Sequence, residues 1–392
     1  MEGHQALQAA VRGRWAVAVM FFVNGFLTGS WAPQIPVFLT RLDISKFTLG
    51  VLILVFGLGA LTFMPLCGYL LARYGSRAVL RGFAAVAVFG LLVVALAPNL
   101  LLAAPAMFLF GALIGGMDVA MNASAVAVER QLSKAVMSSS HGFWSLGGFA
   151  GGGLGGIAIQ AFGHVAHAAM VTAVALALML MAARHLVADD RPAAHEPHHR
   201  FALPRKPAIY LVGLLALFSM IPEGAILDWS ALYLRQELGA GIAAAGLAFA
   251  FFSGTMALMR FAGDGVRNRF GAVTTLRISG LIAACGMLVA ALSPWAWLAI
   301  AAFAFCGLGI ANMVPIAFSA GGNQPGMASG TGMSVVTTMG YSGILIAPSA
   351  IGFAAEHIGF SPIFMALAGF LVIVCLMANL AHTADFAPQP AE

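Results

Sequence analysis

Two carboxylates lie within an apolar stretch of the chain, IPEGAILDWSALYL at residues 221–234: they are Glu223 and Asp228. If this stretch crosses a membrane, each carboxylate costs about 2.5–3.5 kcal/mol at mid-bilayer. Exposure to lipid is therefore excluded, so each must face a water-filled cavity, pair with a partner or carry a proton. Five residues turn an ideal helix by about 140°, so the two would not share a face unless Pro222 and Gly224 distort the helix.

Glu223 lies near the middle of its apolar run and is a candidate for proton transfer, because ionisable groups inside membrane spans are usually functional. The alternative is a structural carboxyl group, either protonated or hydrogen-bonded to a neighbouring helix. Asp228 has the same two interpretations. Arg235, two helical turns further on and nearly on the same face, is positioned to pair with it. We expect the two carboxylates to have different functions.

A second group of candidates combines Asp118 and Asn122 with His141. Asp118 and Asn122 are four residues apart, so they stack on one face of a helix. His141 lies near the start of the next apolar run, at a similar depth. An Asp close to a His forms a proton relay when each shifts the pKa of the other towards neutral pH. The alternative is a charge-assisted contact that holds two helices together and never releases a proton.

The composition identifies the surroundings of these residues. Of the 392 residues, 61% are hydrophobic and only 8% are charged, against about 25% charged in ordinary soluble domains. Only a protein whose surface faces mostly lipid reaches such a ratio. The net charge of +5 is therefore assigned to membrane orientation and not to nucleic-acid binding. The cysteines are expected to be buried free thiols, because no CxxC spacing occurs among Cys67, Cys285, Cys306 and Cys375.

Apolar runs long enough to span a bilayer predict twelve transmembrane helices. The predicted spans start near Arg14, Thr48, Ala78, Leu100, Val136, Val165, Ala208, Gly241, Ala272, Pro294, Ala328 and Phe360. The first run continues to about Leu39, beyond the ~7–15 residues of a signal-peptide core, so we expect a retained span. With the N-terminus in the cytoplasm, every Lys and Arg except Arg41, Lys46 and Arg235 falls on the cytoplasmic side. This bias predicts an inner-membrane protein with both termini in the cytoplasm.

The chain divides into two related halves. A polar, proline-containing segment at residues 187–206 lies between the sixth and seventh spans. ARYGSRAVLR at residues 72–81 aligns with NRFGAVTTLR at 268–277, and the same offset relates Gly111 to Gly307 and Gly147 to Gly343. We therefore expect an all-α membrane protein with a six-helix half at 1–186, a linker at 187–206, a second half at 207–382 and a tail at 383–392. Parallel halves of this kind are a transporter architecture.

The stretch GYLLARYGSRAVLR, at residues 68–81, resembles the signature of the major facilitator superfamily in the loop between helices 2 and 3. The Asp of that signature is replaced by Ala72, and by Asn268 in the second copy; Asp264 is a candidate replacement for the missing carboxylate. The resemblance implies a conformational latch containing Gly68, Arg73, Gly75, Arg77, Arg269 and Gly271. More narrowly, residues 115–130, 138–148 and 223–235 resemble the YbjJ-like group near the fucose permeases.

The resemblance also implies that the first, fourth, seventh and tenth helices line a central cavity, and that residues 221–234 belong to the seventh. Amide and aromatic side chains on these helices suit a small polar or amphipathic ligand. The expected substrate-binding residues are Asn24, Trp31, Asn122, Trp229 and Asn312, together with Tyr341. Each of them alone has an ordinary packing interpretation.

Two other motifs have structural interpretations. The segment SLGGFAGGGLGG, at residues 145–156, lacks the GK[ST] ending of a phosphate-binding loop, and its small residues let two helices approach closely. His195, His198 and His199 lie in the linker without cysteines, and we expect them to be solvated and not to hold a metal.

Together these features predict a monomeric twelve-helix secondary transporter that works by alternating access, without a cofactor. Its partners would be lipid, a small-molecule substrate and protons. The alternatives are a proton-independent facilitator and an exporter of drugs or lipids. A membrane enzyme would be expected to show a metal-ligand cluster or a nucleophile with its base, and a receptor would need an output domain; the sequence shows neither.

Overall fold

The computed structural model describes residues 2–132, 136–188, 206–325 and 329–385, and within them all regular secondary structure is helical. Helices are expected because hydrocarbon offers no hydrogen-bond partners, so a spanning backbone must satisfy its own N–H and C=O groups. The first half contains α1 (Glu2–Trp31), α2 (Gln34–Leu42), α3 (Lys46–Tyr74), α4 (Ser76–Ala87), α5 (Gly90–Leu96), α6 (Leu100–Leu132), α7 (Met137–Phe162) and α8 (His164–Ala183).

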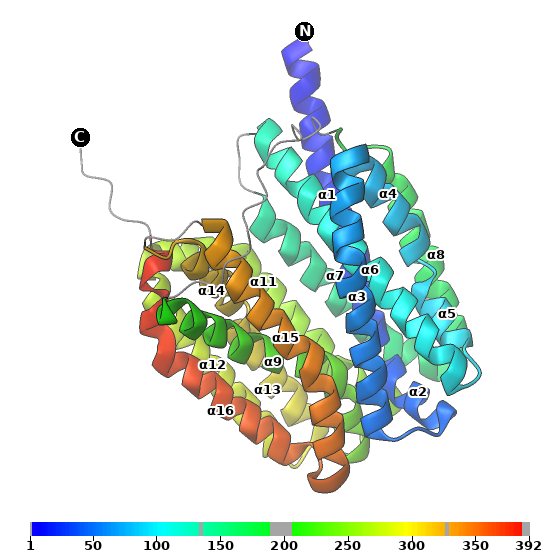
Figure 1. The fold of residues 1–392 in the computed structure, drawn as a ribbon. Helices are drawn as coiled ribbons and strands as arrows, with labels where there is room; N and C mark the ends of the chain where they lie inside the picture. The colour runs from blue at the N-terminus through cyan, green and yellow to red at the C-terminus, as the bar shows by residue number, and fades with distance from the viewer. Residues whose placement is uncertain (1, 133–135, 189–205, 326–328, 386–392) are drawn as a thin grey trace.

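The second half contains α9 (Pro207–Gln236), α10 (Ile242–Ala245), α11 (Leu247–Phe270), α12 (Ala272–Ala291), α13 (Ala296–Ile310), α14 (Met313–Gly322), α15 (Ser329–Ile358), α16 (Ser361–Met377) and the 3₁₀ helix Ala378–Ala384. Figure 1 shows the two halves as adjacent bundles, with the start of α1 and the end of α16 at the same end of the molecule. We call this end the terminal end and the opposite end the distal end. Most of the predicted linker and tail lies outside the described residues.

Eleven helical segments within the described residues are long and apolar enough to cross a membrane. The twelfth predicted span is α7, which has the length but is less apolar because it is rich in glycine and serine. The outer surface carries large apolar side chains such as Leu101 and Leu376, which are 82% and 75% exposed. Such a surface needs lipid around it. The twelve-span prediction is confirmed, with starts within a few residues of those expected except for the first, where α1 begins at Glu2 and the candidate span at Leu7 instead of at Arg14.

The internal repeat is visible in the backbone. The described residues with positive φ are Asp43, Gly75, Gly163, Gly239, Gly271 and Gly359, which form three pairs, each separated by 196 positions. Helix packing repeats as well: a Cβ on Gly111 would lie 1.8 Å from the carbonyl oxygen of Phe56, and one on Gly307 would lie 2.3 Å from that of Phe252. The same offset relates both partners of these contacts.

The glycines of α7 let this helix pack closely on two sides. Gly147 and Gly151 face α1 of the same half, where an added Cβ would lie 2.1 and 2.5 Å from backbone carbonyl oxygens of that helix. Gly148 and Gly156 face the second half, where an added Cβ would lie 2.6 Å from Ser253 Oγ and 2.6 Å from the Ala243 carbonyl oxygen respectively. The predicted close helix approach is confirmed, and α7 is a contact between the halves.

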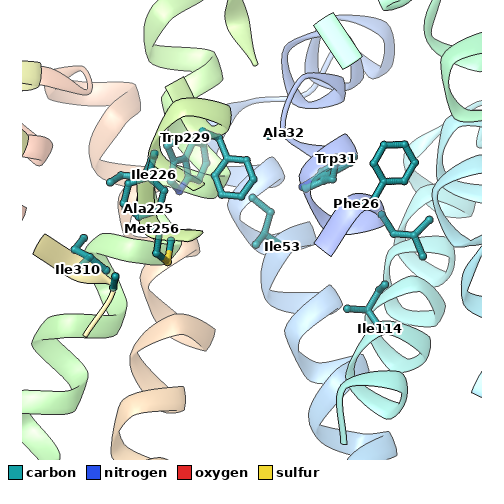
Figure 2. Packing of buried hydrophobic residues seen from close by; sticks show 14 of the residues in the cluster. Phe26, Trp31, Ala32, Ile53, Ile114, Ala225, Ile226, Trp229, Met256 and Ile310 are labelled. Atoms are coloured by element: carbon teal, nitrogen blue, oxygen red, sulfur yellow. The ribbon is translucent and has the colours of Figure 1, made fainter. Parts of the chain in front are cut away.

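The buried core continues from one half to the other. Figure 2 shows part of the cluster, with residues from both bundles. The residues shown there include Phe26, Trp31, Ile53 and Ile114 from the first half, and Ile226, Trp229, Met256 and Ile310 from the second.

The cysteine prediction is correct only in part. All four cysteines are free, and Cys67 and Cys306 are buried, but Cys285 is exposed and Cys375 is half-buried. In an apolar span, an outward-facing cysteine contacts lipid, because burial by other helices depends on the helix face and not on the composition of the run.

The repeat contact gives a stability test. Gly111→Ala should destabilise the protein by at least the ~1–3 kcal/mol typical of overpacking, since the new Cβ meets rigid backbone at Phe56. Gly82→Ala is the control, because no heavy atom lies within 4 Å of its added Cβ, and Ala is favoured over Gly in a helix. Thermal unfolding in detergent should show a lower midpoint for Gly111→Ala and an unchanged or higher one for Gly82→Ala. Equal midpoints for both variants would contradict this packing.

Candidate functional site

A cavity of about 250 Å³ lies between the halves. It is formed by α3 and α7 of the first half and by α9, α11 and α15 of the second. Its lining is mainly apolar and aromatic, and includes Ile53, Phe56, Ala60, Met64, Trp144, Leu227, Phe249, Phe252, Met256, Tyr341 and Ile344. Of the four spans that the family resemblance implied, only the seventh, α9, lines this cavity. Glu223 and Asp228 of α9 are among its lining residues.

Both carboxylates reach the cavity because it follows a wide arc of α9. Glu223, Gly224, Leu227 and Asp228 all line it, and an arc that holds these positions covers about 140° of an ideal helix. From their spacing alone, the two carboxylates would share a face only if the helix were distorted. Pro222 does lie inside α9, but the breadth of the cavity wall is sufficient by itself.

Glu223 forms an ion pair with Arg260. Nη2 of Arg260 lies 3.2 Å from Oε1 of Glu223, and the two side chains are 14% and 22% exposed. Nη1 of the same guanidinium donates a hydrogen bond of 2.6 Å to Oγ of Ser145, which belongs to α7 in the other half. The guanidinium also lies over the Trp144 ring, 5.9 Å from its centroid. Arg260 therefore joins the carboxylate of one half to a hydroxyl group of the other.

Arg260 is not among the site residues expected from the sequence, where it is assigned to the cytoplasmic side with the other basic residues. The structure places it inside the candidate span Ile242–Gly263, so that assignment is wrong. The signal was present: an arginine inside an apolar run has the same need for a partner as Glu223. Opposite charges within two consecutive spans are the natural pair.

Asp228 is 7% exposed and lines the cavity without such a partner. No hydrogen bond or ion pair joins its carboxylate to another residue in the described part of the chain. The expected pairing with Arg235 does not form, since Arg235 donates through Nη1 to the carbonyl oxygen of Ala240, 3.0 Å away. Arg235 therefore bonds to the segment that follows α9 and not to Asp228.

The predicted Asp118 and His141 relay is interrupted by an amide. Nε2 of His141 lies 3.2 Å from Oδ1 of Asn122, and Nδ2 of Asn122 donates to the backbone carbonyl of Asp118, 2.9 Å away. The ring of His141 also packs edge-on against Phe21, with centroids 5.0 Å apart. His141 therefore contacts Asn122 directly, and no hydrogen bond joins it to the Asp118 carboxylate.

Among the six predicted substrate-binding residues, Tyr341 lines the cavity and is 40% exposed. Asn24 is buried, donates to the Ile114 carbonyl oxygen at 3.2 Å and accepts from Trp144 Nε1 at 2.9 Å. It therefore positions Trp144, a cavity residue that the sequence analysis missed. Trp31 packs on Phe38, and Trp229 packs on Phe360. Asn122 and Asn312 lie outside the cavity lining. A binding function for these residues stays a prediction.

The predicted latch residues surround two matching helix junctions at the terminal end. Gly75 and Gly271 have φ values of 79° and 77°, a region that favours glycine. Arg73 donates to the Tyr69 hydroxyl at 3.1 Å, and Arg269 lies over the ring of Phe270. Arg77 is exposed and Gly68 has open space beside it. The Asp264 side chain lies outside the described residues, so its latch function stays a prediction.

The hydrogen bonds between the halves lie at the distal end and at mid-membrane. At the distal end, Lys46 Nζ donates to the Ala355 carbonyl oxygen at 2.9 Å, and Phe47 N donates to Glu356 Oε1 at 2.8 Å. At mid-membrane, Ser253 Oγ donates to the Ser145 carbonyl oxygen at 2.8 Å. Near the terminal end, the side-chain hydrogen bonds found among the described residues stay within one half. The printed hydrogen bonds between the halves are thus concentrated at the distal end and at mid-membrane, while Phe143 of α7 packs edge-on against Phe261 of α11 with ring centroids 5.6 Å apart.

Metal chemistry has no support in the part of the chain that the structure describes, which contains no group of three or more His, Cys, Asp or Glu side chains suited to a metal. The three linker histidines lie outside that part. Twelve spans in two repeated halves, with a charged cavity between them, define a membrane transporter.

Comparison with known proteins agrees with this class. The family model of the Major Facilitator Superfamily matches residues 17–348 and 231–391. An MFS-type transporter of Yersinia pestis is 35% identical over 378 residues, which cover 96% of this chain and 97% of that protein. The membrane protein MosC of Rhizobium meliloti is 33% identical over 384 residues, which cover 96% of this chain and 92% of that protein. The chain belongs to the major facilitator superfamily.

Solved structures show the same fold at low identity. A point mutant of the nucleoside transporter NupG superposes with a TM-score of 0.74 at 12% identity, covering 94% of this chain and 99% of that one. A D-xylose-proton symporter superposes with a TM-score of 0.72 at 14% identity, and the match covers 94% of this chain and 97% of that one. These similarities concern the fold, and the twelve-helix architecture expected from the sequence is confirmed.

The ion pair can be tested by a double-variant cycle. Arg260→Met should lower the unfolding midpoint, because it leaves the Glu223 carboxylate without its partner. The loss should be smaller than the ~3–5 kcal/mol of a fully buried pair, since both groups are partly exposed. Adding Glu223→Gln to Arg260→Met should restore part of the midpoint, because no unpaired charge then remains.

The matched control is Arg130→Met, which removes an exposed arginine at the end of α6 and should leave the midpoint almost unchanged. Thermal unfolding of the single and double variants in one detergent measures the coupling. A double variant no more stable than Arg260→Met would show that the two charges do not interact.

Proposed function

We propose that this chain is a proton-coupled secondary transporter that moves a small solute by alternating access. In this proposal the solute binds in the cavity between the halves, and Glu223 is the proton-coupling carboxylate. The halves are residues 1–186 and 207–382, and the chain acts as a monomer in the inner membrane with both termini in the cytoplasm. The observation that carries the proposal is the Glu223–Arg260 pair, which lies beside the cavity and bonds to the opposite half through Ser145.

The chemistry follows from charge balance in a medium of low polarity. While Glu223 is ionised, Arg260 is held between a carboxylate and the Ser145 hydroxyl. A proton on Glu223 removes most of its attraction for Arg260, and the cation then depends on Ser145 and on the Trp144 ring. Because charges interact strongly where water is scarce, this proton changes the relative energies of arrangements in which α7 and α11 contact each other differently. Protonation thereby biases the conformational equilibrium.

The contacts between the halves support transport by alternating access. The distal end is held by Lys46, Phe47 and their partners on α15. If the bias of basic residues sets the orientation, these contacts close the structure on the side opposite the cytoplasm. Transport then requires the distal contacts to open, while the glycine-rich contact of α7 with α11 serves as the surface on which the halves rock.

An exporter of amphipathic compounds is a second candidate. The specific observation that favours it is the cavity wall, in which Phe56, Phe249 and Phe252 lie beside aliphatic side chains. Apolar walls bind apolar bodies.

Proton coupling is tested with the purified chain in proteoliposomes that contain a pH dye, using a panel of sugars, amino acids, organic acids and amines. We expect transport of one class of compound to change the internal pH of liposomes that contain the wild type. Glu223→Gln should abolish that change while binding of the compound survives, because the amide keeps the shape but carries no exchangeable charge.

The control is Asp43→Asn, which removes an exposed carboxylate from the distal end. Asn also tolerates the positive φ of this position. Transport without proton movement, or a Glu223→Gln variant that moves protons normally, would identify Glu223 as a structural carboxyl group.

Distal closure provides a conformational test. Glu356 accepts a hydrogen bond from Phe47 N across the halves, so Glu356→Ala should weaken closure and populate the distally open state. A thiol reagent added from the distal side should then label Leu227→Cys, in a background without the native cysteines, faster in Glu356→Ala than in the parent. Equal labelling rates would show that this contact does not hold the distal end closed.

A further inference from the structure

The charge inside the cavity is unbalanced. Its ionisable lining residues in the described chain are Glu223, Asp228 and Tyr341, and Glu223 is matched by Arg260. Asp228 is buried, 7% exposed, and has no hydrogen bond or ion pair with a described residue. A carboxylate in this position is stable when a cation or a proton meets it. The cavity is therefore built to receive positive charge.

Few other polar groups of the lining are available to a ligand. Trp144 donates its indole N–H to Asn24, and Glu223 accepts from Arg260. The Asp228 carboxylate, the Tyr341 hydroxyl and the second oxygen of Glu223, whose charge Arg260 already balances, remain. A sugar or other polyol brings many hydroxyl groups and would lose hydrogen bonds with water that these few groups cannot replace. An anion would be placed beside the Asp228 carboxylate, which disfavours it.

The remaining lining suits an apolar body with aromatic rings nearby. Phe56, Phe249 and Phe252 contribute ring surface, and aromatic faces also attract cations. The volume of about 250 Å³ is below the range of about 300–1,000 Å³ that is usual for ligand pockets. A compact ligand with one ring or a short alkyl body fits this space better than a large drug.

We propose that the substrate is a small amphipathic organic cation, an amine with an apolar body, whose ammonium group pairs with the Asp228 carboxylate while its apolar part lies against the phenylalanine rings of the cavity. Asp228 is then the specificity-determining residue, and Glu223 with Arg260 provides the coupling. This inference rests on the proposed transport function and names the substrate class of the same cavity.

The test uses three probes that share one apolar body and differ in the head group: 3-phenylpropylamine, 3-phenylpropan-1-ol and 3-phenylpropionate. Binding to the purified full chain is measured by calorimetry at neutral pH, where the amine is a cation and the propionate an anion. In the wild type the amine should bind at least tenfold more tightly than the alcohol, and the propionate should bind most weakly. An amine that binds no more tightly than the alcohol, or does not bind, overturns the proposal.

Variants of Asp228 assign the preference to its charge. Asp228→Asn should reduce amine affinity at least tenfold to the level of the alcohol, with alcohol binding unchanged, which also shows that the variant is folded. Asp228→Glu keeps the charge and should keep the preference, while Asp43→Asn should behave as the wild type. A preference for the amine that survives Asp228→Asn overturns the proposal, and the wild-type ranking tests it even if that variant does not fold.

The experiments can refute amine binding and proton coupling independently of each other. If the amine binds through Asp228 but moves no protons in proteoliposomes, the proton coupling fails and the substrate class stands. If another class of compound drives proton movement that Glu223→Gln abolishes, the coupling stands and the amine proposal fails.

Discussion

The ion pair between Glu223 and Arg260 is the interaction on which the arrangement of the two halves depends. Neither charge is stable alone in an apolar span, so α9 and α11 must keep these residues together. The guanidinium also bonds to Ser145 of the first half. One half-buried cation therefore satisfies a requirement within the second half and at the same time fixes where α7 of the first half meets it.

Close packing at α7 makes this geometry possible. Hydrocarbon gives helices no hydrophobic reason to associate, so their contacts rely on close van der Waals approach and on polar groups between them. Gly147 and Gly151 hold α7 against α1, and Gly148 and Gly156 hold it against the second half. Ser145 lies at the beginning of this glycine segment. The polar link to Arg260 therefore follows from two helices whose backbones can approach each other.

The sequence predicted the fold better than the site. The twelve spans and the repeat were correct, because span length is set by the bilayer and repeated residues at one offset mark duplicated structure. In the site, the sequence identified Glu223 and Asp228 and one cavity side chain, Tyr341. It missed Arg260 and Trp144, and it paired Asp228 with Arg235, which the structure instead joins to the Ala240 carbonyl oxygen. Charge assignments by loop position fail for an arginine that lies inside a span.

The sequence by itself determined that this chain crosses a membrane many times, that its halves are related, and that Glu223 and Asp228 require compensation. These are properties of one segment or of one repeated pattern, and they depend on the energy of polar groups in hydrocarbon. Only the tertiary structure decided which partner each carboxylate has. Glu223 obtains Arg260, whereas Asp228 remains open to the cavity, because the meeting of helix faces depends on how twelve spans pack and not on the residues of any single span.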